Sequence, residues 1–119
     1  MASSMTFDER AALRVEALYA TPDVAATRVA AFRALEPRPG ERSADLGCGP
    51  GFMTRELALA VGPVGRVHAL DLSEPMLALA RTRCAGLPAV ELAAGDMASL
   101  DLPDGSLDVS IGGGAERRR

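Results

Sequence analysis

The chain has 119 residues, of which 48% are hydrophobic and 24% are charged, and its formal net charge is −3. This composition is typical of one globular domain, although the length is short for a complete enzyme built on an open α/β sheet. The acidic balance argues against a nucleic-acid-binding surface, which needs a basic patch, and no apolar run approaches the roughly 20 residues that span a membrane.

Two helices are expected at the beginning of the chain. Apolar residues at helical spacing predict a helix over Phe7–Tyr19. Thr21 and Pro22 then form a helix start, with Thr21 as the N-cap and Pro22 in the first turn. This second helix ends before Pro37, so residues 1–40 form an N-terminal helical segment.

Strands alternate with helices in residues 41–119. We expect strands at about 42–46 and 67–71, a third beginning at Val90 and a fourth ending at Ile111, with helices over 52–61 and from Ser73 to Gly86. Such an alternation predicts a parallel sheet with right-handed crossovers. His68 falls inside the second strand, where a packed or edge residue is expected more than a catalytic base.

A glycine-rich loop follows the first strand. Residues 44–51 read Ala-Asp-Leu-Gly-Cys-Gly-Pro-Gly, with glycine at Gly47, Gly49 and Gly51. Glycines at alternate positions allow a sharp turn and let a ligand lie against the main chain where a helix begins. The loop therefore predicts a site for a nucleotide-type cofactor. A dinucleotide-binding loop would read G-x-G-x-x-G, but Phe52 occupies the place of its third glycine.

An acidic residue ends the second strand. Asp71 lies 24 positions after Gly47 (71 − 47). A carboxylate at the tip of a neighbouring strand can accept hydrogen bonds from both hydroxyls of a ribose. Asp71 could instead cap the following helix, for which Ser73 is better placed.

The order Asp-x-Gly-x-Gly-x-Gly, then Asp71, then Gly95-Asp96, resembles the class I S-adenosylmethionine-dependent methyltransferases over roughly residues 11–111. The resemblance implies that Asp96 reads the adenine amino group and that Met97 supplies a backbone N–H, while an ordinary Gly-Asp turn remains the alternative for Asp96. Asp45 either orients the glycine loop through backbone N–H groups or contacts the cofactor. The expected S-adenosylmethionine-binding residues are Asp45, Gly47, Cys48, Gly49, Gly51, Asp71, Leu72, Asp96 and Met97.

The implied fold is a Rossmann-like, doubly wound α/β sheet of four parallel strands in the order 3-2-1-4, with helices on both faces. Strand four would be an exposed edge through which copies of the chain could self-associate. Ser43 and Ala44 replace the large branched residues usual in a buried parallel strand, which should weaken the first strand. Residues 41–119 would form the S-adenosylmethionine-binding half of a methyltransferase domain. The glycines and arginines after Ile111 suggest a truncated or frame-shifted fragment, or one piece of a split protein.

The implied reaction is transfer of a methyl group to a small molecule, with quinones, sterols, amines and arsenite all open as acceptors. No catalytic residue is assigned.

Cys48 and Cys84 lack metal-binding or C-x-x-C spacing and follow no signal peptide, so we expect free thiols, no metal site and a cytoplasmic protein. The alternatives are a non-catalytic remnant or split-protein partner and, with less support, an NAD(P)-binding oxidoreductase.

Overall fold

The computed structural model describes residues 4–96, 98, 102, 105–112 and 114–117. Two helices come first, α1 (Phe7–Tyr19) and α2 (Pro22–Leu35). Strands and helices then follow in the order β1 (Arg42–Leu46), α3 (Phe52–Val61), β2 (Arg66–Asp71), α4 (Glu74–Arg83), β3 (Val90–Ala94), β4 (Val109–Ile111) and β5 (Ala115–Arg117). The predicted elements are therefore present in the predicted order, with one additional strand at the end.

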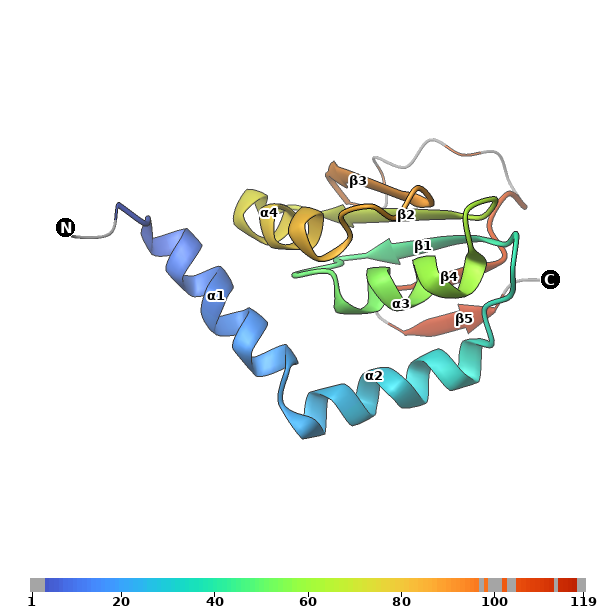
Figure 1. The fold of residues 1–119 in the computed structure, drawn as a ribbon, viewed down its shortest axis with the longest axis horizontal. Coiled ribbons are helices and arrows are strands. Elements are labelled where there is room, and N and C mark those ends of the chain that lie inside the picture. The colour runs from blue at the N-terminus through green and yellow to red at the C-terminus, as the bar shows by residue number, and fades with distance from the viewer. Residues whose placement is uncertain (1–3, 97, 99–101, 103–104, 113, 118–119) are drawn as a thin grey trace.

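The strands form one sheet in the order β3-β2-β1-β4-β5 (Figure 1). β1 pairs in parallel with β2 and with β4, and β2 pairs in parallel with β3, which confirms the predicted order of the first four strands. The prediction that strand four is the exposed edge is wrong, because β5 pairs with β4 in the antiparallel direction. β5 runs back along β4, and between the two strands the Gly112 N–H donates to the Gly114 carbonyl at 2.9 Å. Self-association through strand four therefore loses its structural basis.

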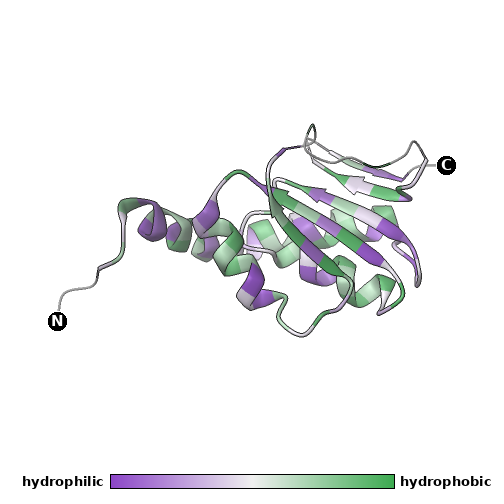
Figure 2. Ribbon diagram, turned by 90° about the horizontal axis from the view of Figure 1, so that it is seen from above, coloured by the Kyte–Doolittle hydropathy of each residue, from purple (hydrophilic) through white to green (hydrophobic). Residues whose placement is uncertain are grey.

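The helices lie on one face of the sheet, and not on both faces as predicted (Figures 1 and 2). Val67 packs with α3 and Ala69 packs with α4, and these two residues share one face of β2. α2 packs against α3 and β5, and α1 packs against α4. The connections from β1 to β2 and from β2 to β3 cross the sheet in the same direction, so right-handed crossovers put α3 and α4 on the same side. A helix on the second face would come from the returning connection between β3 and β4, whose described residues form no α-helix.

Local sequence signals explain where the helices begin. α1 begins with a capping box between Thr6 and Glu9, and α4 begins with the Ser73 side chain accepting from the Met76 N–H. Thr21 occupies the N-cap position of α2, but its hydroxyl donates to the Leu18 carbonyl and does not cap the helix. None of the described helices is both long enough and apolar enough to cross a bilayer.

The first strand is buried even though its side chains are small. Ser43 and Ala44 have no exposed surface, and the Ser43 hydroxyl donates to the Arg66 carbonyl at 3.3 Å. The large apolar side chains of this part of the core come from α3 and β2, where Leu57 and Val61 pack with Val67. The premise that strand one is buried and poor in large apolar residues is thus confirmed.

The end of the described chain is anchored to α2. The Arg117 guanidinium pairs with the Glu41 carboxylate at 2.7 Å and donates to the carbonyls of Leu35 and Glu36, where α2 ends. Cationic groups are favourable at a helix C-terminus, where backbone carbonyls lack partners within the helix. Arg117 therefore has a structural role, and β5 is held in place from outside the sheet.

Candidate functional site

The glycine loop between β1 and α3 has the left-handed backbone that its sequence predicts. The φ angles are 73° at Gly47, 56° at Gly49 and 90° at Gly51, a region that other residues adopt only with strain. Gly51 also lies so close to α4 that a Cβ there would be 2.9 Å from Ala80 Cα. A Cβ on Gly47 would meet no atom within 4 Å. Gly51 is thus required for packing, whereas Gly47 borders open space that a ligand can occupy.

Backbone hydrogen bonds hold this loop against β2. The N–H groups of Gly47 and Cys48 both donate to the Leu70 carbonyl, at 2.7 and 2.8 Å, and the Gly49 N–H donates to Asp71 Oδ2 at 2.8 Å. The loop therefore takes its orientation from β2. The suggestion that Asp45 orients it through these N–H groups is wrong.

Asp71 lies at the end of β2 and connects this strand to the glycine loop and to the start of α4. Its Oδ2 accepts from Gly49, while its Oδ1 accepts from the Ser73 N–H at 2.8 Å just before α4. A carboxylate has about four lone-pair positions, so two backbone bonds leave acceptor capacity on both oxygens. Ser73 caps α4, as expected, and Asp71 fixes the turn that leads into it.

Other predicted site residues lie near Asp71, directly after β2 and β3. The Leu72 side chain is 76% exposed, which is high for a large apolar residue. It is therefore available to cover a flat ligand. Gly95 donates to the Asp71 carbonyl at 3.0 Å, which places the end of β3 beside the end of β2. Asp96 is exposed and its Oδ1 accepts from the Ala98 N–H at 3.0 Å, consistent with a turn residue. Met97 lies outside the described residues.

Asp45 is the buried acid of the site. Only 3% of its surface is exposed, and the Thr54 hydroxyl of α3 donates to its Oδ2 at 2.7 Å. Burial raises the pKa of Asp45 to about 6, and the negative charge of Asp71 contributes in the same direction, against the effect of the Thr54 bond. The carboxyl group is therefore tied to α3 and not to the loop.

A cavity of about 330 Å³ opens beside Asp45, between α2 and the carboxyl ends of β1 and β4. Its floor comes from the predicted site and includes Asp45, Gly47 and Cys48. The opposite wall comes from α1 and α2. The lining residues that sequence reasoning missed are Tyr19, Val24, Thr27, Arg28, Ala31, Leu46, Met53, Ile111 and Gly112. Asp71, Leu72 and Asp96 are not among the lining residues, so the predicted residues fall into two groups on either side of the glycine loop.

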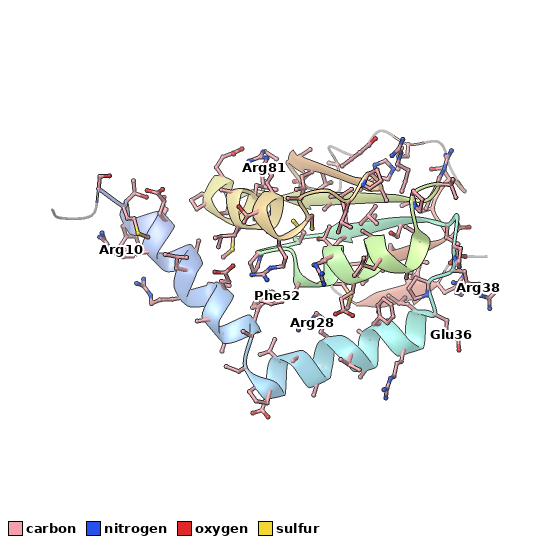
Figure 3. All side chains as sticks on the ribbon, viewed as in Figure 1. Arg10, Arg28, Glu36, Arg38, Phe52 and Arg81 are labelled. Atoms are coloured by element: carbon pink, nitrogen blue, oxygen red, sulfur yellow. The ribbon has the colours of Figure 1, made fainter. Side chains whose placement is uncertain are left out.

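Two arginines lie against Phe52 at the start of α3. The guanidinium carbons of Arg28 and Arg83 are 4.7 and 3.7 Å from its ring centroid, and Figure 3 shows Arg28 reaching from α2 toward this ring. Phe52 also lies beside the Tyr19 ring, with 6.3 Å between ring centroids. Nothing in the sequence near the glycine loop indicates these partners, since Tyr19 and Arg28 belong to helices that precede it.

The two cysteines and His68 are poorly suited to catalysis. Burial raises the pKa of Cys48 to about 12, helped by the charges of Asp45 and Asp71, so its thiolate is strongly disfavoured. Burial also raises the pKa of Cys84. His68 Nδ1 lies 3.3 Å from the Glu91 carboxylate on the neighbouring strand, as expected for a packed strand residue. Within the described part of the chain, no group of three His, Cys, Asp or Glu side chains could hold a metal.

Comparison with known proteins gives matches to methyltransferases. Residues 44–115 match the family described as a methyltransferase domain. The demethylmenaquinone methyltransferase of Bacillus cytotoxicus is 40% identical over 92 residues, which cover 75% of this chain and 39% of that protein. An uncharacterized 37.1 kDa protein in a transposon of Streptomyces fradiae is 53% identical over 75 residues, covering 63% of this chain and 22% of that protein. The chain thus spans well under half the length of these curated relatives.

Solved structures share the fold. An S-adenosylmethionine-dependent methyltransferase from Aquifex aeolicus superposes with a TM-score of 0.68 at 25% identity, covering 88% of this chain and 56% of that one. An S-adenosylmethionine-dependent O-methyltransferase from Thermotoga maritima superposes with a TM-score of 0.63 at 30% identity, covering 71% of this chain and 32% of that one. The chain therefore shares its fold with part of each of these enzymes.

Proposed function

The chain belongs to the methyltransferase domain family, and on that premise we propose that it binds S-adenosylmethionine across the carboxyl ends of β1 and β2. One observation carries the proposal: Gly47 has a left-handed backbone and faces open space, while the adjacent loop is bonded to Asp71. An exposed main chain beside a carboxylate at the ends of parallel strands is suited to a nucleoside ligand.

The predicted site residues divide into two groups in this proposal. Asp71 accepts hydrogen bonds from the ribose hydroxyls, and Leu72 covers one face of the adenine, with Asp96 and Met97 at the adenine edge. Gly47, Cys48 and Gly49 pass under the middle of the cofactor, while Gly51 holds the loop against α4. Asp45 faces the cavity on the other side of the loop, where its negative charge favours the positively charged end of the cofactor.

The proposed reaction is methyl transfer to a small-molecule acceptor. The cofactor, when bound, supplies an electrophilic methyl group. The role of this chain is to hold that group and its acceptor close together and in line, which can account for about 7–11 kcal/mol of a barrier. The similarity to enzymes named demethylmenaquinone methyltransferases supports a small organic acceptor. No described side chain is assigned as a general base, and an acceptor that is already nucleophilic does not require one.

The proposed organisation assigns different tasks to the two parts of the chain. Residues 41–119 carry the glycine loop and the carboxylates, while α1 and α2 within residues 1–40 form a wall of the cavity. We also propose a cytoplasmic location, which is supported by two cysteines that form no disulfide.

Competition binding tests the proposed cofactor. Labelled S-adenosylmethionine should be displaced from the protein by S-adenosylhomocysteine and not by NAD at the same concentration. Preferential binding of NAD would instead support the oxidoreductase alternative. Incubation with labelled S-adenosylmethionine and quinone, sterol, amine and arsenite acceptors then tests the reaction, and cofactor binding without any transfer would support the non-catalytic alternative.

A further inference from the structure

Arg28 carries a charge that has no counterion in the described structure. Its Nη1 donates to the Tyr19 carbonyl at 3.2 Å, but its Nε is buried and has no hydrogen-bond partner. None of the ion pairs among the described residues includes Arg28. A buried guanidinium N–H without a partner is costly, which makes it a position where a ligand is expected to bind.

Packing against Phe52 does not by itself explain why an arginine is present at this position. Arg83 stacks more closely on the same ring, donates to the Pro50 carbonyl and pairs with Glu16. The charge of Arg83 and its Nε donor therefore both have partners within the protein. Arg28 also lies against this ring (Figure 3), but its Nε has no hydrogen-bond partner among the described residues.

The cavity presents opposite charges from two different elements. Arg28 lines it from α2 and Asp45 lines it from β1, and no ion pair among the described residues joins the two. Most of the remaining wall is apolar, from Val24, Ala31, Met53 and Ile111. A separated cation and anion in an apolar cavity complement a zwitterion, such as the ammonium and carboxylate of an amino acid. A planar guanidinium is especially suited to carboxylate oxygens.

We propose that Arg28 binds the carboxylate at the amino-acid end of the cofactor, and that α2 thereby distinguishes ligands that carry this end from those that lack it. This inference rests on the proposed function. It adds a specificity-determining residue outside the glycine loop and the strand ends, supplied by the N-terminal helices.

Calorimetry with two ligands tests this inference. S-adenosylhomocysteine has the amino-acid end, whereas 5′-methylthioadenosine keeps the adenosine and the thioether but lacks it. In Arg28→Met we expect the affinity for S-adenosylhomocysteine to fall about 10- to 100-fold, the range for a charged hydrogen bond that loses one partner. The affinity for 5′-methylthioadenosine should change less than about threefold. Arg33→Met, on an exposed position of the same helix, is the matched control and should change neither affinity.

Three results would overturn the inference, and each would do so for a different reason. Unchanged S-adenosylhomocysteine affinity in Arg28→Met would show that the carboxylate does not bind there. An equal loss for both ligands would show that Arg28 only maintains the structure of the site. If neither ligand binds the wild-type protein, the proposed function is wrong and this inference is wrong with it. Binding of 5′-methylthioadenosine also reports that the variant is folded, and Arg28→Lys should recover part of the lost affinity.

Discussion

The Gly49 N–H donates to Asp71 Oδ2 at 2.8 Å, so the loop after β1 is attached directly to the carboxylate that ends β2. The other oxygen of Asp71 accepts from Ser73 at the start of α4. One carboxylate thus fixes the glycine loop and the beginning of a helix, and it does so at the place where the cofactor ribose is proposed to bind.

Replacing Asp71 with asparagine should weaken both the fold and ligand binding. An asparagine has a single acceptor oxygen, so one of the two backbone N–H donors loses its partner at a cost of about 1–3 kcal/mol. S-adenosylhomocysteine affinity should also fall, by about tenfold or more, because the ribose loses an acceptor. Thermal unfolding and calorimetry measure the two effects separately.

Ser73→Ala is the control for Asp71→Asn. It removes the N-cap of α4 and should cost about 1 kcal/mol of stability without changing ligand affinity. If Asp71→Asn lowers stability but keeps the affinity of the wild-type protein, Asp71 is a structural residue and does not bind the ribose.

Asp45 should make the protein less stable as the pH rises. Its pKa is raised from 3.8 to about 6, so the folded state holds this proton more tightly than the unfolded state does. Its contribution to stability is therefore greatest below pH 3.8 and decreases by about 3 kcal/mol as the pH rises to about 6. Asp45→Asn removes the buried charge and still accepts the Thr54 hydrogen bond. We expect Asp45→Asn to melt above the wild-type protein at about pH 7.5, with a smaller or no advantage at about pH 4.

Melting both proteins across this pH range is informative because the other titrating groups are common to both and cancel in the difference. A difference in melting temperature that stays constant from about pH 4 to about pH 7.5 would mean that Asp45 does not titrate in this interval.

Arg117 should be worth more to stability than an ordinary surface arginine. Arg117→Met removes the ion pair with Glu41 and the bonds to two carbonyls at the end of α2, and should lower the urea concentration at which half of the protein is unfolded. The hydrogen bond from Arg117 lowers the pKa of Glu41, so this pair stabilises the protein above pH 4.5, the usual pKa of a glutamate. The part of the loss that comes from the pair should disappear as the pH falls below that value.

The control for Arg117→Met is Arg38→Met, which removes an ion pair with Glu36 that is exposed on both sides. Its effect should stay within about 0.5 kcal/mol. Equal effects of the two substitutions would contradict the role of Arg117 in anchoring β5.

Local signals made much of the fold predictable. Apolar periodicity identified α1 (Phe7–Tyr19), and glycines marked both ends of α3 (Phe52–Val61), because these features depend on neighbours in the sequence. β5 was missed because Ala-Glu-Arg has no strand pattern and is held by Arg117 contacts to residues about 80 positions earlier. The placement of all helices on one face was also missed, since it depends on which crossover connections carry helices.

The site was predictable to a similar degree. The glycine conformations and the positions of Asp45 and Asp71 at strand ends follow from a short local pattern. Thr54 lies on the buried side of the helix that follows the loop. A hydroxyl at that position of the sequence could have indicated a hydrogen-bond partner for Asp45. Tyr19 and Arg28 reach the cavity only because α1 packs against α4 and α2 packs against α3 and β5, and no spacing within the sequence indicates that contact.

The central claim is that Gly47 borders the bound cofactor, and a pair of glycine substitutions tests it most directly. Gly47 and Gly62 have almost the same φ, 73° and 70°, and a Cβ added at either glycine would meet no atom within 4 Å. Valine at either site imposes backbone strain of about 1–3 kcal/mol. Gly62, with a ψ of −176°, has a backbone conformation that is essentially restricted to glycine, so Gly62→Val controls for strain away from the cofactor site. Calorimetry with S-adenosylhomocysteine should show a loss of at least about tenfold in Gly47→Val and wild-type affinity in Gly62→Val. Equal affinities in the two variants would contradict the claim, because they would show that the open space beside Gly47 is not where the cofactor lies.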